Sequence, residues 1–458
     1  MKDEENILII GAGLCGSLLA LRLGQRGYNV KVMERRLDLR KEDISAGRSI
    51  NLALSNRGIK ALKMVGLENK VKSLCIPMYG RMLHDKSGNT KLSKYSGRKS
   101  EYINSISREL LTALLIDEAE ALNNVSFEFH QKCDGVDFEN NIARFTNTKN
   151  GTVLDYEADR IFGTDGAGST LRKSYLSKRK FLFSFSQNFL THGYKELTIP
   201  ATKEGEFQTE KNALHIWPRG DYMIIALPNL DGSFTVTLFL AYEGGKYNFN
   251  NLNSAEKVQN FFSKEFPDTI ELMPDLTTEF FKNPTSPLGT IKCFPWQYQG
   301  KNLILGDAAH AIVPFYGQGM NASFEDVFEF DATLEAHNGD WEATFKAFQI
   351  KRKKDTDGIA DLAIDNFHEM KDHVASTSFQ QKRTLEMSLE TALPNTYFSK
   401  YSMVTFREDM GYNQAMLLGR AQDKAILNMI EKKQLNLELP AIELHEKIKA
   451  ETNSILKS

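Results

Sequence analysis

The sequence predicts an α/β fold in which a parallel-sheet domain is interrupted by a mostly antiparallel β-sheet domain and followed by a C-terminal helical region. Three observations favour this fold class. The first 34 residues read strand, glycine turn, helix and strand; β-rich segments fill 125–162 and 181–292; and the pattern is almost wholly helical from Asn321 onward. At 458 residues, the chain is also longer than one ordinary domain.

We expect three parts with discontinuous boundaries. The parallel-sheet domain takes residues 1–75, 100–180 and 293–330, the antiparallel substrate domain takes 76–99 and 181–292, and the helical region takes 331–458.

Local patterns place several elements within these parts. Helices are expected at 56–65 and 107–122, and a hairpin in 78–97 should turn at Lys86-Ser87-Gly88-Asn89. The charged run KRKKD at 351–355 is typical of a solvated helix face, and the segment from Asn428 onward predicts a solvated helical tail.

Composition points to a small-molecule partner. A net charge of -2 gives no electrostatic reason to expect nucleic acid or an anionic membrane. The four cysteines are scattered without a C-x-x-C pair, so we expect free thiols in a reducing cytoplasm. His368 and His373 are five apart, which disfavours a metal pair on one helix face, and we expect no metal.

The N-terminal segment carries neither a basic region nor a cleavage site typical of a signal peptide. No window approaches the roughly 20 apolar residues that span a bilayer. We therefore expect a soluble, cytoplasmic protein.

The first chemical motif is Gly11-Ala12-Gly13-Leu14-Cys15-Gly16, between an apolar strand and a helix. Glycines at Gly11, Gly13 and Gly16 allow a sharp turn, close approach to a pyrophosphate and tight helix packing. Glu34 ends the next strand, where it can bind a ribose hydroxyl and would repel a 2′-phosphate. The motif predicts a Rossmann-like site for FAD or NAD, and a βα turn that binds nothing is the alternative.

A second motif, DRIFGTDGAGSTLR at 159–172, ends a short strand at Asp165-Gly166. Asp165 would approach a dinucleotide while Gly166 keeps the backbone clear of it. Taken alone, the segment is also compatible with a plain strand-to-turn connection.

The third motif follows the apolar strand NLILG, where Gly306-Asp307 could bind the hydroxyls of a sugar-alcohol chain. The loop Pro314 to Gly319 then precedes a helix expected to begin near Met320 and Asn321. The positive end of that helix suits a flat ring that carries negative charge when reduced. His310 has no task in such chemistry, so we expect it to have a packing role.

Together the three motifs resemble the flavoprotein aromatic hydroxylases, the group that includes para-hydroxybenzoate hydroxylase. The resemblance implies one bound FAD, transient NAD(P)H and no second Rossmann domain. It implies that the cofactor is bound by these positions: Gly11, Gly13, Gly16, Glu34, Arg108, Asp165, Gly166, Gly306, Asp307, Gly319, Met320 and Asn321. It also implies that Pro314, Phe315, Gly317 and Gln318 face the flavin.

Four further stretches resemble the kynurenine 3-monooxygenase family: GRSINLALSNRG (47–58), YGRMLHD (79–85), YINSISRE (102–109) and YSMVTF (401–406). The likeness implies NADPH- and O₂-dependent hydroxylation of L-kynurenine to 3-hydroxy-L-kynurenine, in tryptophan degradation, through a flavin C4a-hydroperoxide. It assigns the amino acid end of the substrate to Arg81, Tyr95, Asn366 and Tyr401, and it requires no catalytic side chain.

Two alternatives remain open: a related flavin monooxygenase of another aromatic or lipid substrate, and a non-catalytic flavin-binding protein. The family's eukaryotic members carry a hydrophobic C-terminal anchor that this sequence lacks, which favours a soluble, bacterial-type member. The last 40 or so residues could cover the substrate site or mediate dimer contacts. The sequence does not decide between monomer and homodimer, or between NADPH and NADH.

Overall fold

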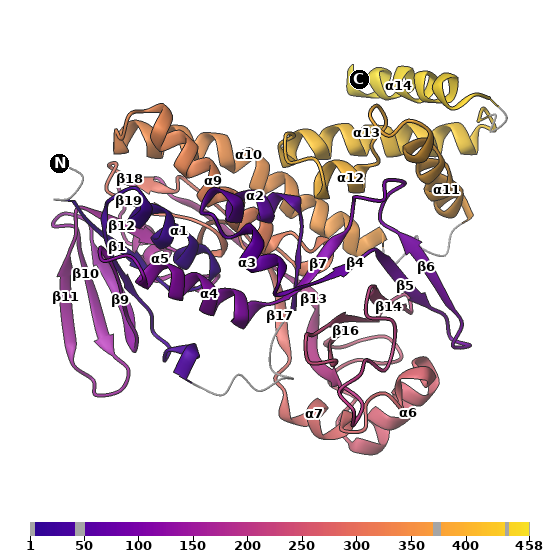
Figure 1. Cartoon of the computed structure of the whole chain (residues 1–458), viewed down its shortest axis with the longest axis horizontal. Coiled ribbons are helices and arrows are strands. Elements are labelled where there is room, and N and C mark those ends of the chain that lie inside the picture. The colour runs from indigo at the N-terminus through magenta and orange to yellow at the C-terminus, as the bar shows by residue number, and fades with distance from the viewer. Residues whose placement is uncertain (1–4, 42–50, 370–376, 436–438, 458) are drawn as a thin grey trace. The chain divides into compact units, whose positions relative to one another are not determined.

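The computed structural model describes residues 5–41, 51–369, 377–435 and 439–457 (Figure 1). The chain forms two compact units. Unit 1 comprises Met1–Cys75, Ile106–Phe189 and Gly289–Ala360, and unit 2 comprises Ile76–Ser105, Leu190–Leu288 and Asp361–Ser458. Since the predicted helical region contributes residues to both units, the three-part division stays a prediction.

Unit 1 is built on a six-stranded sheet of order β18-β19-β12-β1-β2-β8. Its strands are β1 (Asn6–Ile10), β2 (Asn29–Met33), β8 (Val125–Glu128), β12 (Arg160–Gly163), β18 (Gln297–Tyr298) and β19 (Asn302–Ile304). Neighbouring strands run parallel apart from the pair β18 and β19. The predicted α/β class is confirmed.

The order of these strands reverses beside β1. The chain places β2 and β8 on one side of β1 and later places β12 and β19 on the other. Ile10 is in register with Gly163, and Gly163 is in register with Ile304. The turns after β1, β12 and β19 therefore leave the same edge of the sheet, the usual place for a ligand in an α/β fold.

Helices pack around this sheet and enclose an apolar core (Figure 1). The helical elements of unit 1 are α1 (Leu14–Gln25), η2 (Leu39–Lys41), α2 (Asn56–Met64), α3 (Glu68–Lys72), α4 (Arg108–Glu120), α5 (Thr170–Leu176), α8 (Asp307–His310), η4 (Pro314–Tyr316), α9 (Gly319–Ala336) and the first part of α10 (Trp341–His368). Ser107 caps α4 by accepting a hydrogen bond from Leu110 N at 3.3 Å. The helices predicted at 56–65 and 107–122 are confirmed.

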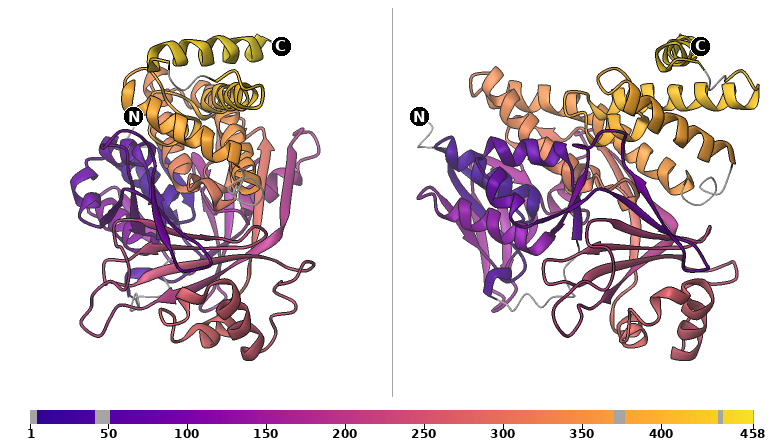
Figure 2. Two further views of the ribbon diagram at one scale, coloured as in Figure 1. Left: turned by 90° about the vertical axis from the view of Figure 1, so that its right-hand side faces the viewer. Right: turned by 45° about the vertical axis from the view of Figure 1, so that its right-hand side comes forward.

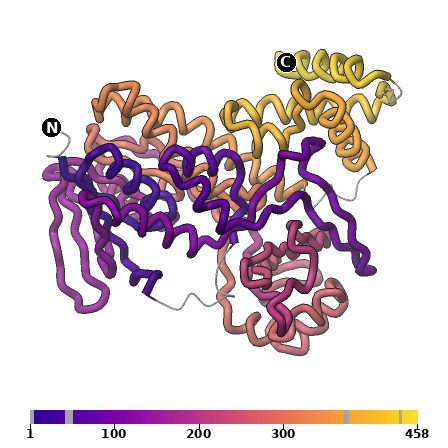
Figure 3. Tube along the Cα trace, viewed as in Figure 1, coloured from indigo at the N-terminus to yellow at the C-terminus, as the bar shows by residue number. Residues whose placement is uncertain are grey.

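The β-rich segment 125–162 contains a separate antiparallel sheet of order β11-β10-β9 (Figure 3). Its strands are β9 (Gln131–Asp137), β10 (Ile142–Asn147) and β11 (Val153–Glu157). Three other short strands form a sheet of order β3-β7-β4: β3 (Asn51–Leu54), β4 (Cys75–Met78) and β7 (Ile103–Ser107).

Unit 2 contains most of a seven-stranded sheet of order β17-β13-β16-β15-β14-β5-β6 (Figure 2). Its strands are β5 (Gly80–His84), β6 (Thr90–Lys94), β13 (Ser184–Ile199), β14 (Leu214–Pro218), β15 (Met223–Pro228), β16 (Phe234–Ala241) and β17 (Ser286–Phe294). The pairs joining β13 to β6 are antiparallel except β14 with β5. The mostly antiparallel prediction is confirmed, as is the hairpin, whose turn includes Gly88 at φ +80°.

Two groups of helices complete unit 2. The first comprises α6 (Ala255–Glu265), η3 (Pro267–Thr269) and α7 (Leu276–Lys282), whose apolar side chains share a core with the sheet. The second comprises α11 (Thr377–Ala392), α12 (Lys400–Thr405), α13 (Tyr412–Glu431) and α14 (Ala441–Lys457), drawn in yellow tones in Figure 2.

The C-terminal segment is helical as predicted, but the prediction of a solvated tail is wrong for one face of α14. Leu444 and Ile448 are buried in a cluster with Leu385, Leu389 and Ile426. Helix α14 is thus part of the packed structure of unit 2. Substrate covering and dimer contacts stay predictions for this segment.

Candidate flavin and substrate sites

The glycine turn after β1 is tightly packed against the protein at Gly11 and Gly16 and open at Gly13. Gly11 has φ +103°, and a Cβ there would lie 2.8 Å from Thr164 O, while a Cβ on Gly16 would lie 2.0 Å from Gly11 O. A Cβ on Gly13 would meet only open space. The first internal bond of α1 is Ser17 N to Gly13 O at 2.9 Å, so the amides of Leu14, Cys15 and Gly16 are available to an anion.

Glu34 lies beside this turn at the end of β2. Its carboxylate accepts hydrogen bonds from Ala12 N at 2.9 Å and Arg36 N at 3.0 Å, and its side chain is 15% exposed. The predicted ribose ligand is therefore fixed next to the predicted pyrophosphate turn.

Asp165 has a buried carboxylate oxygen that accepts no hydrogen bond from the described residues. Its Oδ2 accepts from Thr170 N at 2.6 Å, whereas its Oδ1 is buried without a hydrogen bond from any described residue. Burial, which outweighs bonds from Ser169 and Thr170, raises the pKa of Asp165. Gly166, at φ +78°, leaves open space beside it. A polar group of a bound nucleotide fits this environment.

Gly306 and Asp307 follow β19 at the same sheet edge. Gly306 has φ +56°, and a Cβ there would lie 3.1 Å from Cys15 Sγ and from Ser323 Oγ. Asp307 is exposed although the residues on both sides of it are buried. This carboxylate faces solvent from an otherwise packed turn, as a ligand-binding group must.

The loop before α9 combines a short 3₁₀ helix with a left-handed turn. Pro314 is exposed, Phe315 is buried, and Gly317 adopts φ +67°. Gln318 is 2% exposed and precedes Gly319, where α9 begins. The helix start is one or two residues earlier than predicted.

The side chain of Asn321 is fully used by the protein. Its Oδ1 accepts from Ser55 N at 2.9 Å, and its Nδ2 donates to Ala53 O at 2.8 Å and Gly317 O at 3.0 Å. Any contact of Asn321 with FAD would therefore use its backbone amide. The amides of Gly319, half-buried Met320 and Asn321 all precede the first internal bond of α9, from Ala322 N to Gln318 O.

A buried charge network beneath this loop was not predicted. Arg57 Nη1 lies 2.7 Å from Glu325 Oε1, and Arg352 binds both Glu325 at 2.8 Å and Asp326 at 2.9 Å. Burial alone would raise the pKa of Glu325, but Arg352 and Arg57 hold it below its ordinary value. The solvated-face prediction for KRKKD is thus wrong at Arg352, which is 1% exposed, although Lys351 is exposed.

His310 has the structural role expected for it. Its Nε2 is hydrogen-bonded to Asp326 Oδ2 at 2.5 Å, and the same oxygen accepts from Gly306 N at 2.9 Å. Burial raises the pKa of Asp326, but His310 and Arg352 more than offset this and lower it. The turn that carries Asp307 is therefore tied to the network.

Arg172 is a second group missed by the sequence reasoning. It is buried, and its guanidinium donates to Ala308 O at 2.6 Å and to Ala167 O. It links the segment after Asp165 with the segment after Gly306. Its position in STLR after the Asp-Gly motif was the available clue.

Arg108 begins α4, and its side chain is exposed. Among the described residues it has no hydrogen bond or ion pair through its guanidinium. A ligand could recruit this exposed cation, and its place near the flavin stays a prediction.

Three of the four predicted substrate residues come together in unit 2. The Arg81 guanidinium carbon lies 4.5 Å from the Tyr401 ring centre and 5.4 Å from that of Tyr95, and the two rings stack at 5.5 Å. Asn366 is half-buried on α10 in the same unit, and its place in this cluster stays a prediction.

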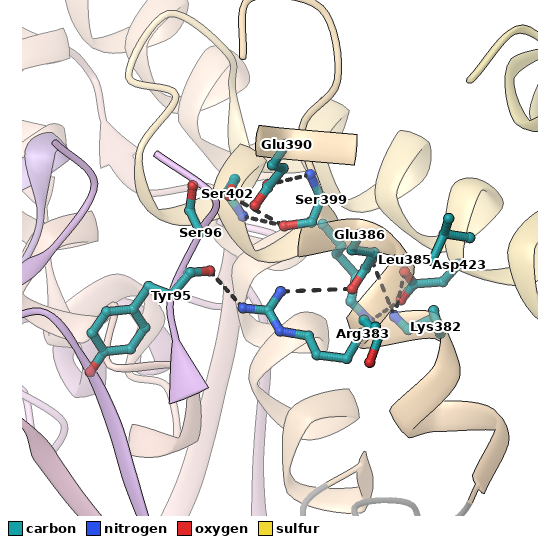
Figure 4. A network of polar contacts seen from close by, with 12 residues as sticks. Tyr95, Ser96, Lys382, Arg383, Leu385, Glu386, Glu390, Ser399, Ser402 and Asp423 are labelled. Atoms are coloured by element: carbon teal, nitrogen blue, oxygen red, sulfur yellow. Dashed lines mark hydrogen bonds and ion pairs between the residues drawn. The ribbon is translucent and has the colours of Figure 1, made fainter. Parts of the chain in front are cut away.

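The hydroxyl of Tyr95 is buried without a hydrogen bond from the described residues. Burial, aided by Tyr401 and opposed by Arg81, raises its pKa well above the ordinary value, so it stays a donor. Its backbone oxygen accepts from Arg383 at 2.7 Å (Figure 4). The chain is thus fixed at the end of β6, and the Tyr95 hydroxyl can donate a hydrogen bond to a ligand.

The sequence predicts neither a metal site nor a membrane-spanning helix, and both can be searched for in the described part of the chain. Within it, no group of three or more His, Cys, Asp or Glu side chains could hold a metal ion; His373 lies outside it. No helix of the described ranges is long and apolar enough to cross a membrane.

Comparison with known proteins agrees with this geometry. A family model described as FAD binding domain matches residues 4–207 and 257–343, more than half of the chain. The fold and the three turns at one sheet edge define an FAD-binding flavoprotein.

Curated relatives specify the family. The chain is 44% identical to kynurenine 3-monooxygenase of Myxococcus xanthus over 428 residues, which cover 93% of this chain and 91% of that protein. It is 42% identical to the Flavobacterium psychrophilum enzyme, with 98% of each chain covered, and 43% identical to that of Dictyostelium discoideum, with 96% of each covered. The chain belongs to the kynurenine 3-monooxygenase family, and the predicted resemblance is confirmed.

Solved structures share the fold at lower identity. A 2-methyl-3-hydroxypyridine-5-carboxylic acid oxygenase superposes with a TM-score of 0.64 at 21% identity, covering 86% of this chain and 98% of that one. Pseudomonas aeruginosa PqsL, in complex with 2-aminobenzoylacetate, superposes with a TM-score of 0.65 at 18% identity, covering 83% and 98%.

Proposed function

We propose that this protein hydroxylates L-kynurenine to 3-hydroxy-L-kynurenine with FAD, NADPH and O₂. One oxygen atom enters the ring, the other leaves as water, and NADPH supplies the electron pair. The observation that carries the proposal is the unsatisfied Tyr95 hydroxyl beside Arg81 and Tyr401, in a chain whose curated relatives carry the name kynurenine 3-monooxygenase.

The residues around the sheet edge in unit 1 suit FAD. The amides of Leu14, Cys15 and Gly16 would bind the pyrophosphate. Glu34 would bind the ribose, and Asp165 and Asp307 would bind the remaining hydroxyl groups of the dinucleotide. The amides at the start of α9 would face the flavin ring, together with the loop from Pro314 to Gln318. When bound, FAD supplies the redox chemistry, namely reduction by NADPH and activation of O₂.

The cluster in unit 2 suits the amino acid end of the substrate. Arg81 can bind a carboxylate through two parallel hydrogen bonds, and Tyr95, protonated because of its raised pKa, can donate a third. Tyr401 packs against the Arg81 cation and limits its freedom. Asn366 would complete the polar contacts.

The reaction requires the substrate ring to be oriented correctly and does not require a strong base from the protein. The ring amino group of kynurenine already donates electrons toward the carbon that is hydroxylated. The protein's contribution is to hold that carbon in position and to exclude water, which would release the oxygen as hydrogen peroxide.

A reducing cytoplasm fits the four cysteines, none of which is paired in the described residues. We therefore propose a cytoplasmic enzyme, and sedimentation of the holoenzyme decides between monomer and homodimer.

The function is tested by NADPH oxidation on the purified yellow protein, with and without L-kynurenine. We expect oxidation to accelerate with substrate and 3-hydroxykynurenine to appear by mass spectrometry. A protein that oxidises NADPH only with another aromatic compound would reveal a related monooxygenase, and one that oxidises none would be a flavin-binding protein without this activity.

A further inference from the structure

Two buried histidines form a hydrogen-bonded chain in unit 2, at the end of the strand that carries Arg81. His84 on β5 lies with Nε2 2.8 Å from His215 Nδ1 on β14, and with Nδ1 3.0 Å from Asp268 Oδ2 in η3. His215 Nε2 lies 2.7 Å from the backbone oxygen of Glu210. Because side chains alternate along a strand, His84 and Arg81 occupy opposite faces of β5.

Counting hydrogens shows that this chain needs an additional proton. Both of its ends, the Asp268 carboxylate and the Glu210 carbonyl, are acceptors. The three contacts each require one hydrogen, whereas two neutral imidazoles carry only two between them. Either one histidine is an imidazolium or Asp268 is protonated.

The surroundings favour His84 as the holder of that proton. Burial lowers the pKa of His215 to about 4, so this ring is neutral and donates through Nε2. Burial alone would raise the pKa of Asp268, but bonds from His84 and Trp217 lower it, which keeps the carboxylate ionised. The Trp217 ring stacks on His84 at 4.0 Å with 21° between planes, a placement that stabilises a cation.

We propose that His84 is an imidazolium clamped between Asp268 and His215, and that this buried cation positions strand β5 and, through it, Arg81. The cation joins three segments distant in sequence. Arg219 adds to the fixation by donating to the backbone oxygens of His84 at 2.9 Å and Asp85 at 3.1 Å. His84 is a positioning residue, and only its effect on substrate rests on the proposed function.

Other charged groups face the cluster from the packed elements around it. A cavity of about 600 Å³ is lined by His84 together with Asp85, Lys86, Lys91, Arg219 and Glu265. Lys86 pairs with buried Glu265, and Arg219 is engaged with backbone oxygens. Among these charged groups, Asp268 is the carboxylate that is hydrogen-bonded directly to His84, and it is therefore the counter-ion.

A metal ion is a poor alternative for this pair. Zinc needs each nitrogen about 2.0–2.1 Å away on either side of it. The 2.8 Å between His84 Nε2 and His215 Nδ1 is a hydrogen-bond distance that leaves no such space.

Nuclear magnetic resonance of the ¹⁵N-histidine-labelled holoenzyme tests the proton directly. We expect both ring nitrogens of His84 to be protonated near neutral pH, with His215 protonated only at Nε2, the signals being assigned with His84→Gln. A neutral His84 overturns the proposal, whatever the enzyme's activity. If His84→Gln does not fold, Asp268→Asn serves instead and should abolish the imidazolium spectrum.

The positioning role is tested by the affinity for L-kynurenine, measured from the fluorescence of bound FAD between about pH 6 and 9. We expect wild-type affinity to fall at the pH where the spectrum shows His84 losing its proton. His84→Gln should bind about 10-fold more weakly at low pH and lose that pH dependence, while His337→Gln in unit 1 should behave as wild type. An unchanged pH profile in His84→Gln overturns the positioning role. Absence of kynurenine binding at any pH counts against the proposed function but leaves the spectroscopic result to judge the proton.

Discussion

At the scale of single residues, we propose that Arg81 and Tyr95 divide the recognition of the substrate carboxylate between charge and hydrogen bonding. Arg81 lies over two aromatic rings, and Tyr95 keeps its proton because burial raises its pKa. An unmet donor of this kind is costly in a protein without its ligand. This cost supports the proposal that the cluster of Arg81, Tyr95 and Tyr401 binds a ligand.

Replacing Arg81 with alanine should raise KM for L-kynurenine by roughly 10- to 150-fold, because a charge-assisted hydrogen bond contributes about 1.5–3 kcal/mol. FAD content should not change. Steady-state kinetics with absorbance of bound flavin check both points. Lys99→Ala, which removes an exposed charge near the same hairpin, is the matched control. An unaltered KM in Arg81→Ala would remove this residue from the carboxylate role.

Asp307 makes a different prediction, because its carboxylate belongs to the proposed cofactor site. Asp307→Ala should weaken FAD affinity by about 10-fold or more, so that the protein is purified with less yellow colour. Titration with FAD and a thermal melt of the apoprotein separate loss of binding from loss of folding. A variant that keeps its full complement of flavin would count against the Gly306-Asp307 interpretation.

At the scale of elements, helices α9 and α10 are joined by charges rather than by apolar contacts alone. Glu325 and Asp326 on α9 share Arg352 of α10, and Asp326 also fixes the turn at Gly306. Removal of one partner from such a buried set leaves a charge without compensation. The position of the loop before α9 therefore depends on a residue far along the chain.

We expect Arg352→Met to lower the free energy of unfolding by about 3–5 kcal/mol near neutral pH, since the buried carboxylates of Glu325 and Asp326 lose the arginine that they share. Lys351→Met, next to it and exposed, should change stability by less than about 0.5 kcal/mol. Urea unfolding at several pH values measures both variants.

The pH dependence of this effect has a definite sign. The folded-state pKa values of Glu325 and Asp326 lie below their ordinary values of 4.5 and 3.8, so their stabilisation is present above those values. It is lost as pH falls through the lowered folded values. The stability deficit of Arg352→Met should therefore shrink below about pH 5, where protonation neutralises the two carboxylates that have lost Arg352. A deficit that stays constant would contradict the assignment.

The C-terminal helix offers a second test at this scale. Ile448 is 1% exposed and Ile442 is 50% exposed on the same helix α14. Ile448→Ala should lower the free energy of unfolding by about 2–5 kcal/mol, and Ile442→Ala should have little effect. Equal effects of the two substitutions would restore the solvated-tail interpretation.

At the scale of the whole molecule, the features that can be predicted from the sequence are those that a short stretch of chain determines. The glycine turn at Gly11, the Asp165-Gly166 pair and the loop after Gly306 each follow an apolar strand, and strand ends in a parallel sheet meet at one edge. Arg81, Tyr95 and Tyr401 came only from the family resemblance, because nothing in their local sequence favours a binding role.

Contacts between distant segments could not be predicted in the same way. The run KRKKD predicts a solvated face because its lysines dominate the local pattern. The contacts of Arg352 and Arg57 with Glu325 form only in the folded chain. The chain from Asp268 through His84 to His215 likewise spans three segments. Periodicity indicates which face of an element is apolar, but it does not indicate which buried charge meets which.

The most direct test of the function is a reaction of the purified holoenzyme with NADPH and L-kynurenine under ¹⁸O₂, followed by mass spectrometry of the product. We expect 3-hydroxykynurenine with one heavy oxygen atom, formed only when both NADPH and substrate are present. Hydrogen peroxide as the sole product, or a hydroxylated product whose oxygen comes from water, would contradict it.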